Sequence, residues 1–191
     1  YGITHTIFHE LVDEKLRKII VDLYKIECRG CGNNHLKDVI SFGLSPLANN
    51  LLKEKNQDYE LYPLEMKYCP DCHNCQLSVV VPPEIMFDNY LYVSSTSPVF
   101  RKHFEDMADK FIDEFELNEN SLVVDIGSND GIFLKPLKEK GIGILGIDPA
   151  TNVCKIANEN GIETLEGYFD SNMVSDINTK IDKVDIVTGF N

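Results

Sequence analysis

The chain has 191 residues, of which 43% are hydrophobic and 26% are charged, as in ordinary globular domains. Its formal net charge of −13, from 18 basic and 31 acidic residues, repels phosphate backbones and argues against nucleic acid as a partner. No stretch approaches the roughly 18 apolar residues of a membrane span, and the first residues lack a secretory signal pattern. We therefore expect a cytoplasmic protein of one or two domains without membrane contact.

The first 25 residues carry apolar side chains at helical spacing. They share one predicted helical face: Ile7, Phe8, Leu11, Val12, Leu16, Ile19, Ile20 and Leu23. We expect an N-terminal amphipathic helix over residues 1–25, which must dock on its own chain or on another.

Two C-x-x-C pairs, 37 residues apart, account for four of the six cysteines. Each pair folds tightly enough for both thiolates to reach one metal, and two pairs complete a tetrahedron. The predicted zinc ligands are Cys28, Cys31, Cys69 and Cys72. Four thiolates leave no position for water or substrate, so we expect a structural zinc ion. Residues 26–96 are predicted to form a small zinc-binding domain with little regular structure, held by the metal.

Other roles for these cysteines fit less well. The run Cys69, Cys72 and Cys75 has the spacing of iron–sulfur ligands, but the Cys28/Cys31 pair would then leave one thiolate too many. A redox pair is disfavoured because neither C-x-x-C opens a helix after a strand. His73 and Cys75 are interpreted as neighbours of the site, and Cys154 as a small core residue.

Residues 97–191 are predicted to be a linker helix followed by an α/β domain. Ser97 is a suitable cap, and Pro98 fits the first helical position, where its missing N–H costs nothing. From residue 121, apolar strands alternate with helices at 130–140 and 150–160, which predicts a parallel sheet covered on both faces. The four expected strands are "SLVVDI", "IGILGID", "IETL" and "VDIVTGF".

A glycine-containing turn, "DIGSNDG", joins the first of these strands to a helix. Both the dinucleotide fingerprint G-x-G-x-x-G and the phosphate-binding G-x-x-x-x-G-K-[ST] are absent. The turn instead carries two acids, Asp125 and Asp130, where a pyrophosphate would need positive charge. Asp148 ends the next strand, where a carboxylate can accept both ribose hydroxyls. A nucleoside with a cationic tail and no phosphate fits, so we predict S-adenosylmethionine, with another nucleotide or a turn that holds no ligand as the alternatives.

The remaining cofactor contacts are predicted from the ends of the strands, where ligands bind in such sheets. Tyr168 and Phe169 follow the third strand and could stack on adenine, with core packing as an equal alternative for Phe169. The full predicted cofactor set is Asp125, Gly127, Ser128, Asn129, Asp130, Gly131, Asp148, Pro149, Tyr168, Phe169 and Asn191.

The paired cysteine turns, the segment "NYLYVSS" and the motifs "GSNDG" and "GIDPA" resemble the sugar C-methyltransferases over residues 26–191. In that family a zinc-binding domain precedes a class I methyltransferase domain. The resemblance implies that a carbon next to a keto group on a nucleotide-linked deoxysugar is methylated through an enolate. It also implies that Tyr90 or Tyr92 reaches the substrate, with packing between domains as an equal alternative.

The same resemblance places the family's catalytic histidine–glutamate pair beyond residue 191, so we expect this chain to be truncated after its fourth strand and inactive alone. The fourth strand would be an exposed apolar edge, covered by a second copy or by the N-terminal helix. Two alternatives remain: an O- or N-methyltransferase with the same zinc domain, and a non-enzymatic zinc-ribbon interaction module.

Overall fold

The computed structural model describes residues 23–48, 50–52, 54–87, 90–179 and 181–190. The predicted helix over residues 1–25 falls almost wholly outside this part of the chain, and so does Asn191. The described residues form two compact units that divide between Pro82 and Pro83. The expected boundary, between residues 96 and 97, lies further along the chain. No helix in the described ranges is long and apolar enough to cross a membrane.

The first unit is built on an antiparallel sheet of three strands: β1 (Lys37–Ser45), β2 (Tyr62–Tyr68) and β3 (Cys75–Leu77). The expectation of little regular structure in this domain was therefore wrong. The register of β1 shifts twice, between Asp38 and Ile40 and between Ser41 and Leu44. Such irregularities break the alternation of apolar and polar residues, which explains why the strand pattern is weak in the sequence.

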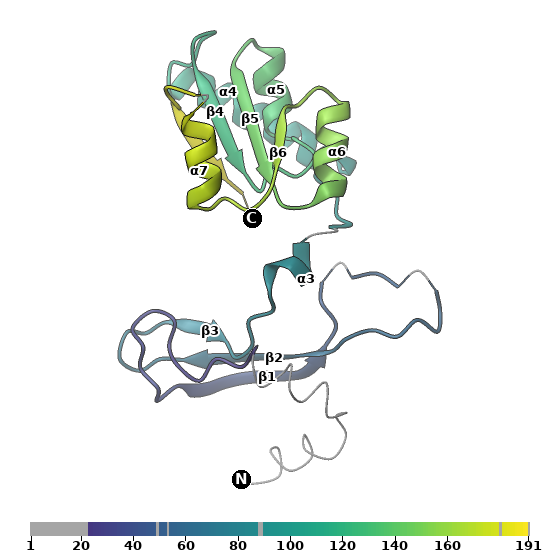
Figure 1. Cartoon of the computed structure of the whole chain (residues 1–191), viewed down its shortest axis with the longest axis vertical. Coiled ribbons are helices and arrows are strands. Elements are labelled where there is room, and N and C mark those ends of the chain that lie inside the picture. The colour runs from purple at the N-terminus through teal and green to yellow at the C-terminus, as the bar shows by residue number, and fades with distance from the viewer. Residues whose placement is uncertain (1–22, 49, 53, 88–89, 180, 191) are drawn as a thin grey trace. The chain divides into compact units, whose positions relative to one another are not determined.

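The second unit contains a parallel sheet in the order β6-β5-β4-β7 (Figure 1). Its strands are β4 (Leu122–Ile126), β5 (Gly143–Asp148), β6 (Thr164–Glu166) and β7 (Ile186–Gly189). The predicted parallel, doubly wound half-sheet is thus confirmed. Among the described strands β7 lies at an edge, and Val187 within it is 57% exposed. Pairing of this edge with a second copy stays a prediction.

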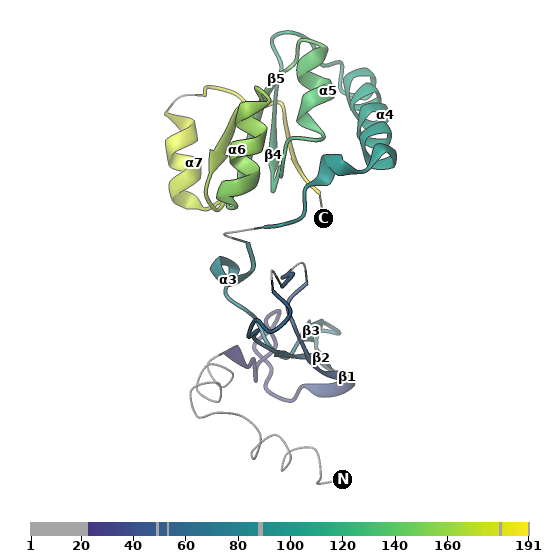
Figure 2. The same ribbon diagram turned by 90° about the vertical axis from the view of Figure 1, so that its right-hand side faces the viewer.

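Helices cover both faces of this sheet (Figure 2). On one face α4 (Pro98–Glu114), α5 (Leu134–Glu139) and α6 (Thr151–Glu159) contribute to a core around Val123, Phe133 and Leu137. On the other face α7 (Ser171–Asn178) packs Ile177 against Val124, Leu145 and Ile147. Continuous burial of both faces is why these strands read as unbroken apolar runs in the sequence.

Helices α4 and α7 begin at residues whose side chains cap the first turn. The Ser97 hydroxyl accepts a hydrogen bond from the Phe100 N–H, and Pro98 is the first residue of α4, both as predicted. Helix α7 was not expected from the sequence. Its cap is Asp170, whose Oδ1 accepts from the N–H groups of Asn172 and Met173 at 2.9 Å each. A short helix (α3, Pro83–Phe87) and a 3₁₀ turn (Ser94–Thr96) precede α4.

Gly131 gives a test of the packing between the turn before α5 and the segment that joins α6 to β6. Its φ is +79°, and a Cβ added there would lie 2.7 Å from Ile162 Cγ2. We expect Gly131→Ala to destabilise the second unit by about 2–4 kcal/mol, combining backbone strain with overpacking. Hydrogen exchange of the β4 and β5 amides would measure the loss.

Gly141→Ala is the matched control, because Gly141 also has a positive φ (+84°) but a Cβ would meet nothing within 4 Å. It should cost only the strain, about 1 kcal/mol. Equal losses in the two variants would contradict the packing role assigned to Gly131.

Candidate functional site

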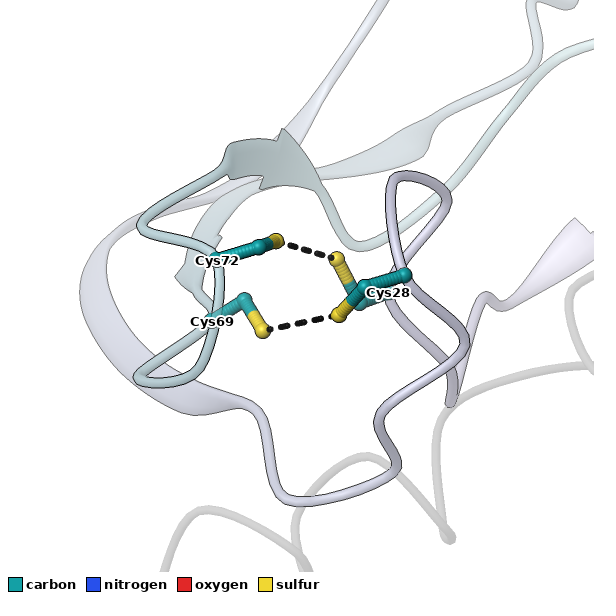
Figure 3. Close-up of side chains that lie close together, drawn as sticks. Cys28, Cys69 and Cys72 are labelled. Atoms are coloured by element: carbon teal, nitrogen blue, oxygen red, sulfur yellow. Dashed lines mark hydrogen bonds between the residues drawn. The ribbon is translucent and has the colours of Figure 1, made fainter.

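The four predicted zinc ligands come together in the first unit. One ligand atom from each of Cys28, Cys31, Cys69 and Cys72 lies within 4.8 Å of the others. The Cys28–Cys72 and Cys31–Cys69 sulfur pairs are 3.5 and 3.6 Å apart (Figure 3). Zinc–sulfur bonds of about 2.3 Å in a tetrahedron require sulfur separations of about 3.8 Å, so the cluster has the size of a Zn²⁺ site. The exposed Cys75 is not in the cluster, which removes the basis for the iron–sulfur alternative.

The two cysteine turns are built alike. In the first, the Cys28 N–H donates to Asn33 O and the Gly32 N–H donates to Cys28 O. In the second, the Cys69 N–H donates to Asn74 O and the His73 N–H donates to Cys69 O. The fifth residue of each turn has a positive φ, 77° at Gly32 and 61° at His73. The two C-x-x-C sequences thus form the same backbone turn, with a glycine in the left-handed position of the first and a histidine in that of the second.

A residue missed by the sequence reading, Gln76, ties the two turns together. Its side chain is buried, donates from Nε2 to Glu27 O at 2.9 Å, and accepts at Oε1 from the Arg29 N–H at 2.8 Å. The Asn74 amide donates to the same Oε1 and also to Cys28 Sγ. These bonds fix the first turn against β3, so the cysteine positions are held by outer contacts as well as by the metal.

The second candidate site lies where β4 leaves the parallel sheet. Gly127 has φ of +69°, and its N–H donates to Ile147 O at the end of β5. A Cβ placed on Gly127 would meet no atom within 4 Å, because the residue borders an open pocket. The bare backbone therefore faces space that a ligand can fill.

That pocket has a volume of about 340 Å³ and lies within the second unit. Asp125, Gly127, Ser128 and Asn129 of the glycine turn line it. The Ser128 hydroxyl is buried and has no hydrogen-bond partner in the described part of the chain. The other residues that line the pocket are Tyr92, Ser94, Phe100, His103, Phe104, Ile132, Phe133 and Phe190. An apolar cavity with a few polar groups at one wall is the usual form of a small-molecule site.

Asp125 places a carboxylate in this wall. The residue is 3% exposed, and its Oδ1 accepts from the Thr188 hydroxyl at 2.7 Å. Burial raises the pKa of Asp125 to about 6, against the opposing effect of the Thr188 hydrogen bond, and the nearby Asp148 carboxylate adds to the increase. A cationic ligand would offset the burial of this charge, whereas an anionic one would increase its cost.

Asp148 holds the glycine turn in place. Its Oδ2 accepts from the Asn129 N–H, and its Oδ1 accepts from the Ala150 N–H, both at 2.9 Å. The predicted contact with ribose hydroxyls stays a prediction. It is compatible with these bonds because each carboxylate oxygen can accept more than one hydrogen bond.

Asn129 and Asp130 bind the segment 92–95, which precedes α4 and is called the strap below. The Asn129 side chain accepts from the Ser94 N–H and donates to Tyr92 O, each at 3.0 Å. Asp130 Oδ2 accepts from the Ser95 N–H. These contacts put Tyr92 and Ser94, both from the segment resembling a substrate-binding region, in the lining of the pocket.

The other predicted contacts lie away from the pocket lining. The Tyr90 backbone is held by both amide atoms of Asn152, at 3.1 and 2.7 Å. Gly131 faces Ile162, and Phe169 is exposed after β6. Two further predicted residues, Pro149 and Tyr168, follow the ends of β5 and β6. Their roles toward a cofactor remain predictions.

The four-cysteine cluster and the strand order define a class: a metal-binding unit followed by part of a doubly wound, Rossmann-like α/β sheet. Residues 28–87 match a family described as "Putative zinc binding domain". The chain is also 35% identical over 156 residues to the C-methyltransferase NovU of Streptomyces niveus, a match that covers 81% of this chain and 37% of that protein. This chain spans little more than a third of the length of that relative.

Two solved structures show partial likeness. A SAM-dependent methyltransferase from Archaeoglobus fulgidus is 26% identical, with 35% of this chain and 29% of that one covered and a TM-score of 0.29. A methyltransferase structure from Methanococcus maripaludis is 22% identical, with 49% and 36% covered and a TM-score of 0.31.

Zinc content tests the ligand set. We expect one zinc per chain in the wild type and in Cys75→Ser, and almost none in Cys69→Ser, measured by elemental analysis after gel filtration. Loss of the metal should also remove exchange protection from β2 and β3, because the two turns have little apolar core of their own. Loss of zinc in Cys75→Ser would contradict the assignment.

The Asp125 carboxyl predicts a pH dependence of stability. Its folded pKa of about 6 exceeds the ordinary 3.8, so between these values the folded unit binds more protons than the unfolded chain. The stability contributed by the protonated form is complete below about pH 4 and is lost as the pH rises through 6.

Exchange of the β4 and β5 amides between pH 4 and 7 would report this loss. Asp125→Asn should flatten the dependence. A residual slope of the same sign should remain, because burial also raises the pKa of Asp148. An unchanged slope in Asp125→Asn would show that other groups cause it.

Proposed function

We propose that this chain is the zinc-binding and cofactor-binding part of an S-adenosylmethionine-dependent C-methyltransferase. The observation that carries the proposal is the pocket at the end of β4, where bare backbone at Gly127 and a buried carboxylate at Asp125 share one wall. This wall suits a nucleoside with a cationic tail, since none of the described residues that line it is a lysine or arginine able to receive phosphate. The name of the relative, a C-methyltransferase, supports the reaction class.

The cofactor would supply an activated methyl group on a sulfonium. The residues of this chain would orient it: Gly127 by leaving its backbone open, Asp125 by charge, and Asp148 by holding the turn. The reaction itself needs a base that removes a proton from the acceptor carbon and a donor that stabilises the resulting enolate. The resemblance to sugar C-methyltransferases places the base beyond residue 191, so we expect the chain alone to bind cofactor without transferring methyl groups.

The acceptor we propose is a nucleotide-linked keto-deoxysugar. Support comes from the strap, because Tyr92 and Ser94 line the same pocket as the glycine turn. Both are fixed there by the Asn129 side chain. A group that reaches the acceptor must lie near the methyl donor, and Tyr92 meets this condition through its place in the lining. Tyr90, which is outside the lining, is the weaker candidate for a catalytic contact.

The zinc ion has a structural role in this proposal. Its four cysteines fill the tetrahedron, so neither water nor substrate can coordinate the metal. The chemistry proposed for the second unit therefore does not involve it.

Calorimetry with S-adenosylhomocysteine tests cofactor binding. We expect the full 191-residue chain to bind it, and to bind ATP at least about tenfold more weakly because a triphosphate meets the Asp125 charge. Gly127→Ala should weaken S-adenosylhomocysteine binding about tenfold or more, since its Cβ enters the pocket and its φ is positive.

Gly141→Ala, at a positive-φ glycine away from the pocket lining, is the control and should leave the affinity unchanged. Absence of heat with S-adenosylhomocysteine would refute the methyltransferase proposal and favour a zinc-ribbon interaction module.

A further inference from the structure

Two asparagine side chains of the second unit each bind backbone groups of the segment that precedes α4. The Asn129 amide binds Tyr92 O and the Ser94 N–H. The Asn152 amide binds both backbone groups of Tyr90: its Oδ1 accepts from the Tyr90 N–H at 3.1 Å, and its Nδ2 donates to Tyr90 O at 2.7 Å. A side-chain amide that bonds an N–H and a C=O replaces the pairing that a neighbouring strand would give. Each asparagine therefore fixes this segment at one point.

The two asparagines have a common support at the end of β5. Asn152 is the second residue of α6, and the Ala150 N–H just before that helix donates to Asp148 Oδ1 at 2.9 Å. The other oxygen of the same carboxylate accepts from the Asn129 N–H. One buried side chain therefore holds the two stretches of chain that carry the asparagines, so their points of attachment keep a fixed relation.

A pair of aromatic rings connects Asn152 to the pocket. The Tyr90 and Tyr92 rings meet edge-on, with their centroids 6.4 Å apart. Tyr92 lines the pocket, whereas the described lining includes neither Tyr90 nor Asn152. Because the Tyr92 side chain is 38% exposed, its own packing is limited, and the backbone bonds on either side of it decide where its ring lies.

We propose that Asn152 is a positioning residue for the pocket: by holding Tyr90 it keeps Tyr92 in the lining, without touching the ligand itself. A ligand that meets Tyr92 in a released strap would first have to order that segment, at a cost in affinity. This inference rests on the proposed function only in its choice of S-adenosylhomocysteine as the ligand. The ordering of the strap by Asn152 is a property of the ligand-free chain.

Amide exchange in the ligand-free chain of 191 residues tests the first step. Asn152→Ala removes the acceptor of the Tyr90 N–H directly, so the informative amides are those of Ser94 and Ser95, whose side-chain acceptors are unchanged. We expect both to exchange about five- to tenfold faster, because the segment loses two part-buried hydrogen bonds. The β4 and β5 amides and the thermal unfolding should not change, because alanine is a better helix former than asparagine.

Two further variants separate hydrogen bonding from packing. Asn152→Asp has nearly the same size and keeps the acceptor, but it lacks the donor to Tyr90 O, so its strap amides should exchange as fast as in Asn152→Ala. Asn160→Ala is the matched control, because the exposed Asn160 side chain donates to Ile156 O of its own helix. It should leave the strap amides unchanged. Wild-type exchange in Asn152→Asp would contradict the role of the paired hydrogen bonds.

Calorimetry with S-adenosylhomocysteine tests the second step, from Tyr92 to the ligand. Asn152→Ala should weaken binding about three- to fivefold, and Asn160→Ala should not weaken it. If Asn152 acts through Tyr92, the two substitutions are not additive: in a Tyr92→Ala background, Asn152→Ala should change the affinity by less than about twofold. A general loss of stability would weaken binding equally in both backgrounds.

The outcomes keep this inference apart from the proposed function. Unchanged exchange of the Ser94 and Ser95 amides in Asn152→Ala would overturn the positioning role. Unchanged affinity in that variant, or equal weakening with and without the Tyr92 ring, would overturn it as well. Absence of S-adenosylhomocysteine binding to the wild type would refute the proposed function and the step from Tyr92 to the ligand, while exchange in the ligand-free chain still decides whether Asn152 orders the strap.

Discussion

The second unit depends on one carboxylate that joins two strand ends. Asp148, at the end of β5, accepts from the Asn129 N–H with one oxygen and from the Ala150 N–H with the other. The first bond holds the turn after β4 in a shape with positive φ at both Gly127 and Asn129. With the turn fixed, the Asn129 side chain is in position to bind the strap, and the strap adds Tyr92 and Ser94 to the lining of the pocket. The buried hydrogen bond between Asp148 and the Asn129 N–H thus positions both the glycine turn and the strap, which line the pocket.

The first unit depends on a different constraint, the closure of a tetrahedron by four thiolates. Its sheet exposes Phe42 and other large apolar side chains of β1, so burial within the described part of the unit is limited. Metal coordination supplies a cross-link where the core is small. The buried Gln76 of β3 adds hydrogen bonds to the backbone of Glu27 and Arg29, which hold the first cysteine turn against that strand. The two units therefore use separate means to order short loops, a metal in one and a buried carboxylate in the other.

Predictions from the sequence were confirmed where a few consecutive residues define the local geometry. Features that depend on contacts between distant parts of the chain were missed. The cap at Ser97 and the two cysteine turns were predicted because local geometry defines them. The strands of the zinc-binding unit were missed because register shifts obscure their alternation. The hydrogen bonds from the Ser94 and Ser95 N–H groups to Asn129 and Asp130, more than 30 residues away in sequence, were not predicted, and cofactor binding by these two residues stays a prediction. His103 was not predicted, because only the folded unit shows that this residue of α4 lines the pocket.

The sequence by itself determined the metal ligands, the order of the α/β elements and the turn that exposes backbone to a ligand. Each of these follows from spacing or from intrinsic backbone preference over a few residues. Only the tertiary structure decided which polar groups face the pocket and which are used to build it. Asp125, Asp130 and Asp148 are all carboxylates near one turn, but their neighbours make the first a pocket wall, the second a fastening for the strap, and the third the support of the turn. Neighbours brought together by folding, which spacing does not specify, make that distinction.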